Sequence, residues 1–239
     1  MTPPVNHPAC YTTGRYRAGR LWLGERVVAR LVRDAAALGL GALDPRDVEA
    51  RLLAVGRASF GGDGEGVVRL EARAGGELVA STRPLGPEPA TWRAIAARVV
   101  HPGPGPAPGA KRAEVKELSS ARAELEAAGV DEALLFDAAG CLVEGARTNL
   151  ALALADGRRV VPPAARGAVR GVALEAALAA GVTLAEHDVT RAECAGAREI
   201  VATNAVRGAR PIVALDGARV GDGGPGPLAR ALAAALARG

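Results

Sequence analysis

The sequence of 239 residues is poor in several residue types, and each shortage narrows the interpretation. Aromatic residues make up 3% of the chain, so the core must be packed mainly with Ala, Leu and Val. Three cysteines, Cys10, Cys141 and Cys194, are far apart in the sequence. Their odd number and wide spacing argue against a disulfide framework and against a zinc site. We therefore expect reduced thiols and a cytoplasmic protein.

Histidines are also few, and none stands near a second potential metal ligand. His7, His101 and His187 are isolated from one another in the sequence. None is three or four residues from another ligand type in a convincing cluster, as a metal site on a helix would require. We interpret all three as ordinary surface or linker histidines and expect no bound metal.

Long apolar runs and dense basic runs are both missing. No apolar run is long enough to span a bilayer, and the N-terminus lacks the charged-then-apolar layout of a signal peptide. The net charge of +4 comes from scattered residues, without basic runs interleaved with aromatic residues. We expect neither a membrane nor a nucleic acid as partner, although a small positive excess suits an anionic ligand.

The chain has the composition of a folded protein, with 49% hydrophobic and 23% charged residues. Such a chain can bury a core and form one large domain or two modest ones. The segment HPGPGPAPGA alternates proline and glycine, which excludes both helix and strand. We predict a small N-terminal domain at residues 1–100, a linker at 101–110 and a larger domain at 111–239.

Hydrophobic periodicity and turn residues predict the elements of the N-terminal part. After a loose polar tail, we expect a helix over 24–40 and a second helix opened by Asp44 and Pro45. A hairpin should follow, with strands at 67–73 and 76–82. Residues 90–100 fit either a strand or a short helix.

The same criteria predict a larger set of elements after residue 111. We expect helices at 116–130, 167–181, 190–197 and 226–238, and strands at 132–137, 141–145, 149–155, 158–163, 182–189, 199–205 and 210–215. Many of these strands are joined by short turns, so much of the sheet should be antiparallel. The predicted class is α+β, or a mixed α/β roll or barrel.

One segment is a candidate for phosphate binding. Residues 162–177 run from an extended stretch past Gly167 into a predicted helix whose first turn carries Arg170. The first turn of a helix has unpaired N–H groups and a positive dipole end, which suit a phosphate. The pattern alone nevertheless favours a capped amphipathic helix with surface arginines. No Walker-type loop occurs, and the glycine-rich residues 61–66 read as a turn.

Two charged residues allow either a plain or a chemical interpretation. Lys111 is one of only two lysines, with Lys116, in an arginine-rich chain. A lysine amine can form a Schiff base, which a guanidinium cannot, but the pattern alone favours a solvated lysine by default. Glu144 ends an apolar strand, either as an acid in solvent or as a carboxylate aimed at a cationic ring nitrogen.

Three stretches together resemble a known family. They are DEALLFDAAGCLVEGARTNL at 131–150, GAVRGVALEAA at 167–177 and EIVATNAVRGARP at 199–211, with Arg30–Leu31 upstream. The pattern is similar to that of the fold-type IV pyridoxal-phosphate enzymes. These include branched-chain aminotransferases, D-amino-acid aminotransferases and aminodeoxychorismate lyases. The resemblance is strongest over residues 111–212.

The resemblance implies a cofactor, a fold and a set of site residues. It implies that Lys111 forms an aldimine with pyridoxal 5'-phosphate and moves protons. It also implies that Glu144 binds the pyridine nitrogen and that Asn149 fixes the strand that ends at Glu144. The residues implied at the phosphate are Arg30, Ala168, Val169, Arg170, Asn204 and Ala205. The implied fold is a two-domain class IV aminotransferase-like fold. It has a small N-terminal α/β domain and a larger, mixed β-barrel-like domain with helices. A homodimer is also implied.

The resemblance leaves the reaction open. A class IV aminotransferase would move an amino group between an amino acid and a 2-oxo acid, and an aminodeoxychorismate lyase is the alternative. The family's N-terminal hairpin is not recognisable here, and Val169 and Ala205 replace two threonines of the phosphate site. A homologue that has lost catalysis and acts as a binding or scaffold protein is therefore a third interpretation.

Overall fold

A computed structural model describes residues 8–87 and 89–238. Its backbone contacts divide the chain into two compact units. The first unit comprises residues 1–86 and 110–114, and the second comprises 87–109 and 115–239. Residues 101–109, predicted to be a linker, thus group with the second unit. Residues 110–114 return to the first, where the backbone N–H of Tyr11 donates to the carbonyl of Lys111 at 3.0 Å.

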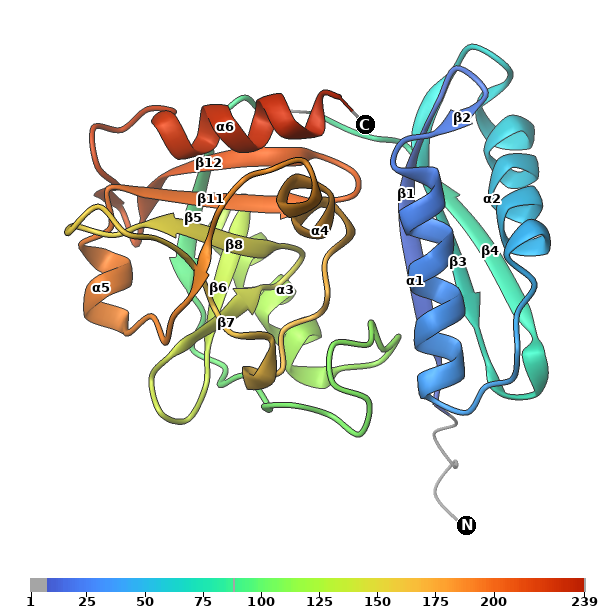
Figure 1. Cartoon of the computed structure of the whole chain (residues 1–239), viewed down its shortest axis with the longest axis horizontal. Helices are drawn as coiled ribbons and strands as arrows, with labels where there is room; N and C mark the ends of the chain where they lie inside the picture. The colour runs from blue at the N-terminus through green and yellow to red at the C-terminus, as the bar shows by residue number, and fades with distance from the viewer. Residues whose placement is uncertain (1–7, 88, 239) are drawn as a thin grey trace. The chain divides into compact units, whose positions relative to one another are not determined.

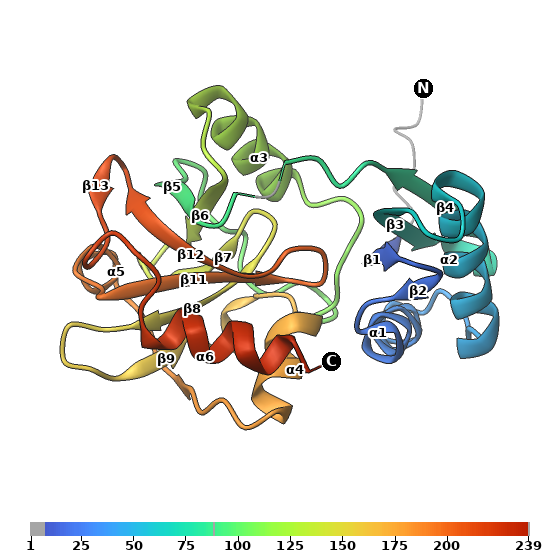
Figure 2. The same ribbon diagram turned by 90° about the horizontal axis from the view of Figure 1, so that it is seen from above.

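The first unit is a four-stranded antiparallel sheet with two helices on one face (Figures 1 and 2). Its strand order is β2-β1-β3-β4. The elements are β1 (Cys10–Arg17), β2 (Arg20–Leu21), α1 (Gly24–Ala37), α2 (Pro45–Phe60), β3 (Glu65–Ala72), the 3₁₀ turn η1 (Ala74–Gly76) and β4 (Leu78–Arg83). Asp44 caps α2 as predicted, and its side chain accepts the N–H of Arg46 at 2.9 Å.

The prediction of a loose N-terminal tail was wrong from Cys10 onward. Strand β1 pairs with β3 along its whole length and with β2 at its end. Its alternate residues Cys10, Thr12 and Tyr16 are all 0% exposed. This inward face is made of small and partly polar residues, so it does not show up as an apolar alternation.

The second unit contains the remaining elements. They are β5 (Trp92–Ala96), α3 (Lys116–Ala128), β6 (Glu132–Phe136), β7 (Leu142–Gly145), β8 (Asn149–Ala153), β9 (Arg159–Val161), the 3₁₀ turn η2 (Ala164–Arg166), α4 (Val172–Ala179), β10 (Ala185–Glu186), α5 (Arg191–Ala195), β11 (Glu199–Asn204), β12 (Gly208–Leu215), β13 (Ala218–Arg219) and α6 (Pro227–Leu236). Residues 90–100, left undecided above, contain strand β5. The predicted strand at 182–189 shrinks to the two residues of β10.

A nine-stranded mixed sheet organises this unit. Its order is β10-β9-β8-β11-β12-β5-β6-β7, with β13 paired to β12. The hairpin partners are antiparallel, as expected, whereas β5 lies parallel to both β12 and β6. The two edges approach each other, because the backbone N–H of Leu142 on β7 donates to the carbonyl of Val189, just beyond β10, at 2.8 Å. The sheet is therefore curled into a half-barrel.

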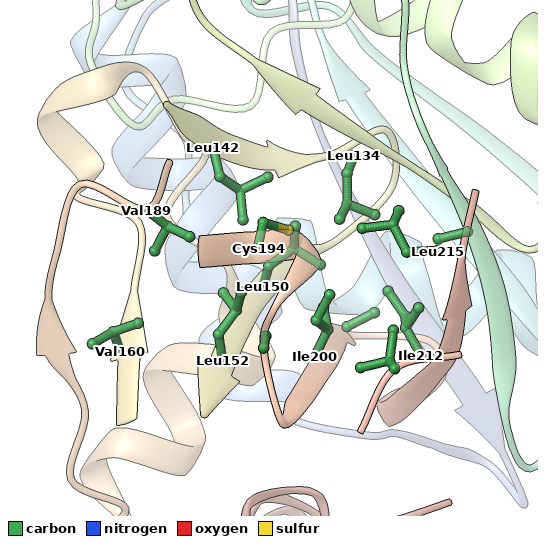
Figure 3. Close-up of a cluster of buried hydrophobic side chains, with 14 of the residues drawn as sticks. Leu134, Leu142, Leu150, Leu152, Val160, Val189, Cys194, Ile200, Ile212 and Leu215 are labelled. Atoms are coloured by element: carbon green, nitrogen blue, oxygen red, sulfur yellow. The ribbon is translucent and has the colours of Figure 1, made fainter. Parts of the chain in front are cut away.

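The concave side of this sheet is filled with aliphatic side chains (Figure 3). Leu134, Leu142, Leu150 and Leu152 meet Ile200 there, each at most 1% exposed. Helix α3 covers the opposite face of β6, and α6 packs on β11 and β12 (Figure 1). Residues in a strand alternate between the two faces, which explains why these short strands are apolar throughout. Among the described residues, no helix is both long and apolar enough to cross a membrane.

Candidate cofactor-binding site

Glu144 is a buried carboxylate on strand β7 with a protein group at each oxygen. It is 4% exposed and pairs with Leu135 of β6. Its Oε2 accepts the backbone N–H of Val169 at 3.0 Å, and its Oε1 lies 3.4 Å from Nε2 of His101. Burial of a carboxylate requires such partners, because the group loses its hydration. Its two oxygens offer about four acceptor positions, so one more donor can be accommodated.

Asn149 links strands β8 and β11 to the loop that contains Val169, the residue whose N–H bonds Glu144. Its Nδ2 donates to the carbonyl of Val169 at 2.7 Å. Its own carbonyl accepts the hydroxyl of Thr203 at 3.3 Å, and Thr203 on β11 is also its register partner. The peptide groups of Val169 are therefore held on one side by Glu144 and on the other by Asn149. Asn149 therefore fixes the loop at Val169, and its role in fixing the strand that carries Glu144 stays a prediction.

Residues 167–171 precede helix α4, and the prediction that the helix starts at Gly167 was wrong. The helix begins at Val172, with Gly171 as its N-cap. Gly167 has φ of +108°, a left-handed conformation that a helix cannot include. Arg170 thus lies before the first turn, and its N–H donates to the carbonyl of Gly109 at 2.9 Å. Ala168, between them, is buried.

Residues 101–109 form a strap along this loop. His101 contacts Glu144, and its backbone N–H donates to the carbonyl of Phe136 at 2.8 Å. A Cβ on Gly167 would lie 2.5 Å from the carbonyl group of Gly103, so the two backbones pass close together. The interpretation of His101 as a surface or linker residue was wrong: it is 5% exposed. A histidine inside a Pro/Gly segment gives no pattern from which its burial could be predicted.

Asn204 and Ala205 lie at the end of β11. The Asn204 side chain closes the turn that follows, because its Oδ1 accepts the N–H groups of Val206 at 3.0 Å and Arg207 at 2.7 Å. Ala205 is 5% exposed. The pairing of Thr203 with Asn149 brings this strand end beside the Asn149–Val169 contact. Their role at a phosphate stays a prediction.

Arg30 lies in the first unit, buried on helix α1. It is 4% exposed, and its Nη2 donates to the hydroxyl of Thr12 at 2.9 Å. That hydroxyl donates in turn to the carbonyl of Val27 at 2.8 Å. Thr12 therefore orients the guanidinium of Arg30. The sequence did not reveal this role of Thr12, because strand β1 was not recognised from its pattern.

Lys111 also belongs to the first unit, where its backbone is bonded on both sides. Its N–H donates to Oδ2 of Asp34 at 2.9 Å, and its carbonyl accepts the N–H of Tyr11. Its Nζ lies 5.0 Å from the centre of the Tyr11 ring. Asp34 is 1% exposed, so a buried carboxylate on α1 fixes the lysine's backbone. The sequence analysis did not single out Asp34.

Glu132 is a second buried carboxylate in the second unit, beside the turn after Glu144. It accepts the hydroxyl of Thr148 at 2.7 Å and the N–H of Ala133 at 2.9 Å. Burial raises its pKa to about 7, against the opposing effect of these hydrogen bonds. It lies on β6, whose partner β7 carries Glu144. Glu132 therefore holds the turn between β7 and β8 through its hydrogen bond with Thr148.

The other polar groups do not form a competing site among the described residues. Over 8–87 and 89–238, no group of three or more His, Cys, Asp or Glu could hold a metal ion. His187 contacts Glu193 at 2.9 Å, and His7 lies outside the described residues. The three cysteines are free and buried, and burial raises the pKa of Cys10 and of Cys194 to about 12. Thiols with such pKa values stay protonated and are poor nucleophiles.

The candidate residues thus fall into two groups, one in each unit. The second unit brings together Glu144, Asn149 and Val169, with Ala168, Arg170, Asn204 and Ala205 on the adjoining segments. The first unit holds Arg30 and Lys111. Taken one by one, these groups fit different parts of pyridoxal phosphate. The carboxylate suits a protonated ring nitrogen, the amine suits an aldehyde, and the guanidinium suits a phosphate.

Comparison with known proteins identifies the family. The family model of class IV amino-transferases matches residues 9–215. The 4-amino-4-deoxychorismate lyase of Pseudomonas aeruginosa is 30% identical, with a TM-score of 0.77 over 100% of this chain and 96% of that one. No curated protein matches the chain.

Two further solved structures share the fold. The branched-chain amino acid aminotransferase of Escherichia coli is 19% identical, with a TM-score of 0.79 over 95% of this chain and 84% of that one. A hypothetical aminotransferase from Mycobacterium tuberculosis in its PLP-bound form is 22% identical, with a TM-score of 0.76 over 98% and 89%.

The chain belongs to the class IV aminotransferase family, whose members are pyridoxal-phosphate-dependent enzymes. The mixed α/β fold with a curled half-barrel sheet is the fold that the resemblance implied, and the family resemblance is confirmed. The roles of the individual site residues stay predictions.

Proposed function

We propose that the protein is a pyridoxal-phosphate-dependent enzyme that moves an amino group between an amino acid and a 2-oxo acid. The observation that carries the proposal is the Glu144 carboxylate, which is buried and has, among the described residues, the Val169 N–H at Oε2 and His101 at Oε1. A carboxylate with acceptor positions left over can accept a hydrogen bond from a cationic partner. We assign the ring nitrogen of the cofactor as that partner, an assignment that family membership supports.

When bound, the cofactor supplies an electron sink for the carbon that carries the substrate's amino group. Glu144 would hold the proton at the ring nitrogen by offering it a buried carboxylate oxygen as acceptor. Asn149 and Val169 keep Glu144 in place, because the Val169 peptide bonds both side chains. Asn149 and Val169 thus hold the Glu144 carboxylate in its binding position before the substrate arrives, so that it need not reorganise during the reaction.

Lys111 is the proposed catalytic residue. Its amine would hold the cofactor through the aldehyde carbon and, once the substrate's amine has displaced it there, would take a proton from the substrate carbon and return it. Asp34 and Tyr11 fix the backbone of Lys111. A base must lie within hydrogen-bond distance of the proton that it takes. The anchored backbone restricts the positions that the amine can reach, and so helps to keep it within that distance.

The phosphate end is assigned to cationic and backbone donors. Arg30 offers a guanidinium that Thr12 orients. The first turn of α4 offers N–H groups that an α-helix leaves without intrahelical acceptors. The N–H groups of Ala168 and Ala205 complete the proposed set. The N–H groups of Val169 and Arg170 donate to Glu144 and Gly109 instead, so Val169 acts mainly on the carboxylate.

The aminodeoxychorismate lyase reaction is a second candidate, and the comparisons give a specific reason for it. The relative that is 30% identical is a lyase, and this chain covers 96% of its length, against 84% for the branched-chain aminotransferase. Both reactions begin by removing a proton from the carbon that bears the amine, so the residue roles above serve either one.

One set of assays tests the proposal. The purified protein, supplied with pyridoxal phosphate, is given an amino donor with 2-oxoglutarate and, separately, aminodeoxychorismate. Formation of glutamate and a new oxo acid supports transamination, whereas pyruvate with p-aminobenzoate supports the lyase. Lys111→Ala should abolish either activity, and Lys116→Ala, the matched control, should leave it unchanged. A cofactor-loaded protein inactive with a broad panel of amines would favour the scaffold interpretation.

Assembly and location are further predictions. A homodimer follows from the resemblance to the family, and a cytoplasmic location follows from the three free cysteines. Size-exclusion chromatography with light scattering checks the first: a mass near 48 kDa, about twice the 24.1 kDa of the chain, is expected.

A further inference from the structure

We propose that His101 is a positioning residue that holds the Glu144 carboxylate through Nε2–H and so sets its affinity for the cofactor ring. The inference rests on the proposed function, because it concerns the partner of the ring nitrogen. It starts from the buried contact between the His101 imidazole and the Glu144 carboxylate. His101 stands in the strap, ten residues before Lys111.

The hydrogen bonds of the imidazole define its tautomer. The backbone N–H of Gly103 donates to Nδ1 at 3.1 Å, so Nδ1 must be unprotonated. In a neutral imidazole the proton is then on Nε2, the atom 3.4 Å from Oε1 of Glu144. His101 is thus a donor to Glu144, and the donor is neutral.

The strap prevents the imidazole from turning away. The N–H of His101 donates to the carbonyl of Phe136 at the end of β6, and its ring accepts from Gly103 within the strap. Both side chains of the pair are buried, at 3% exposed for His101 and 5% for Glu144. The absence of a side chain at Gly167 lets the strap lie against the loop that carries Val169.

A neutral second donor has a chemical advantage over a cation in this position. With Val169 N–H on Oε2 and His101 on Oε1, the carboxylate is fixed in rotation about its last bond. An arginine or lysine here would neutralise Glu144 and weaken its attraction for a protonated ring nitrogen. A neutral imidazole orients the Glu144 carboxylate without neutralising it, so the carboxylate can still attract a protonated ring nitrogen.

Two measurements test the proposal. The first is ¹⁵N NMR of the imidazoles in the full-length protein saturated with pyridoxal phosphate, with His101 assigned by the signals lost in His101→Gln. We expect a protonated Nε2 and an unprotonated Nδ1. The opposite tautomer, or a freely exchanging pair, would overturn the inference, and the tautomer itself is read in the unaltered protein.

The second measurement is the dissociation constant of pyridoxamine phosphate, which has the same ring but no aldehyde for Lys111. His101→Met keeps the size of the side chain and removes the donor, and we expect about tenfold weaker binding. His101→Gln places an amide N–H near the position of Nε2 and should bind within about threefold of the original protein. His187→Met is the matched control and should change nothing.

The double variant shows whether His101 acts through Glu144. In a Glu144→Gln background, His101→Met should weaken binding far less than about tenfold, because the group it orients is already altered. Additive effects of the two changes would contradict the inference, since His101 would then serve the fold alone. If the original protein binds neither pyridoxal nor pyridoxamine phosphate, the proposed function itself fails. If it binds both and His101→Met binds equally well, only the inference fails.

Discussion

Asn149 and Gly171 are packed so closely that only a glycine fits at the second position: a Cβ on Gly171 would overlap Oδ1 of Asn149. The backbone of Gly171 has φ of −81°, which any residue can adopt. The requirement for glycine is therefore purely one of space. Asn149 also bonds the Val169 carbonyl, so the packing at Gly171 and the position of the Glu144 partner are coupled.

Gly171→Ala should displace Asn149 from Val169 and loosen the loop around Glu144. Overpacking of this kind costs about 1–3 kcal/mol, and we expect a loss of unfolding free energy in that range with weaker cofactor binding. In an Asn149→Ala background the methyl group has room, so the added cost should fall below about 1 kcal/mol. Urea unfolding of the four proteins measures the coupling. An equal cost in both backgrounds would show that Asn149 is not what excludes a side chain here.

Asp34→Ala tests the anchoring of Lys111. The change removes the acceptor of the partly buried Lys111 N–H, and a donor left unsatisfied costs up to about 1–3 kcal/mol when fully buried. A small displacement of a reacting group lowers turnover strongly, so we expect kcat to fall by about 10- to 100-fold. Steady-state kinetics and thermal unfolding are the measurements.

Asp47→Ala is the control for that experiment. Asp47 forms an exposed ion pair with Arg51 on α2, a pair that contributes at most about 0.5 kcal/mol. It should leave kcat and stability nearly unchanged. Unchanged turnover in Asp34→Ala would mean that the Asp34 contact does not control the lysine.

Glu132 predicts a defined pH dependence of stability. Its pKa is raised by burial from 4.5 to about 7 in the folded protein, so the folded state binds more protons than the unfolded state between these values. The contribution of Glu132 to the unfolding free energy is fully present below pH 4.5, where the side chain is protonated in both states, and it is lost as the pH rises through about 7. Relative to Glu132→Gln, the native protein should lose on the order of 3 kcal/mol of unfolding free energy across this window.

Urea unfolding of the native protein and Glu132→Gln at several pH values between 4.5 and 8 measures this difference. Other titrating groups are common to both proteins and cancel. A constant difference across the range would show that Glu132 titrates normally despite its burial.

Most of the fold could be predicted from the sequence, because local patterns coincide with the elements. The caps at Asp44 and Thr190 and the turns at Gly75–Gly76 and Asp156–Gly157 mark helices and hairpins that the structure contains. Strand β1 could not be predicted from periodicity, because its buried face consists of Cys, Thr and Tyr. The extent of the α4 helix was overestimated, because its N-terminal residues pack against the strap instead of forming a turn.

The site was harder to predict than the fold, for a related reason. Glu144 and Lys111 stand in a recognisable spacing, whereas their partners are distant in sequence. His101 lies 43 residues from Glu144, and Asp34 lies 77 residues from Lys111. Such contacts depend on the tertiary arrangement within each unit. Proline and glycine in the strap also indicate a loop without showing that the loop is packed.

Identification of the lysine that carries the cofactor tests the central claim most directly. The protein is loaded with pyridoxal phosphate, reduced with borohydride to make the attachment permanent, digested, and analysed by mass spectrometry. Only Lys111 and Lys116 supply side-chain amines, five residues apart, so the peptide map separates them unambiguously. We predict a stoichiometric label on Lys111 that persists in Lys116→Ala. A label on Lys116, or no label with the cofactor in excess, would contradict the account.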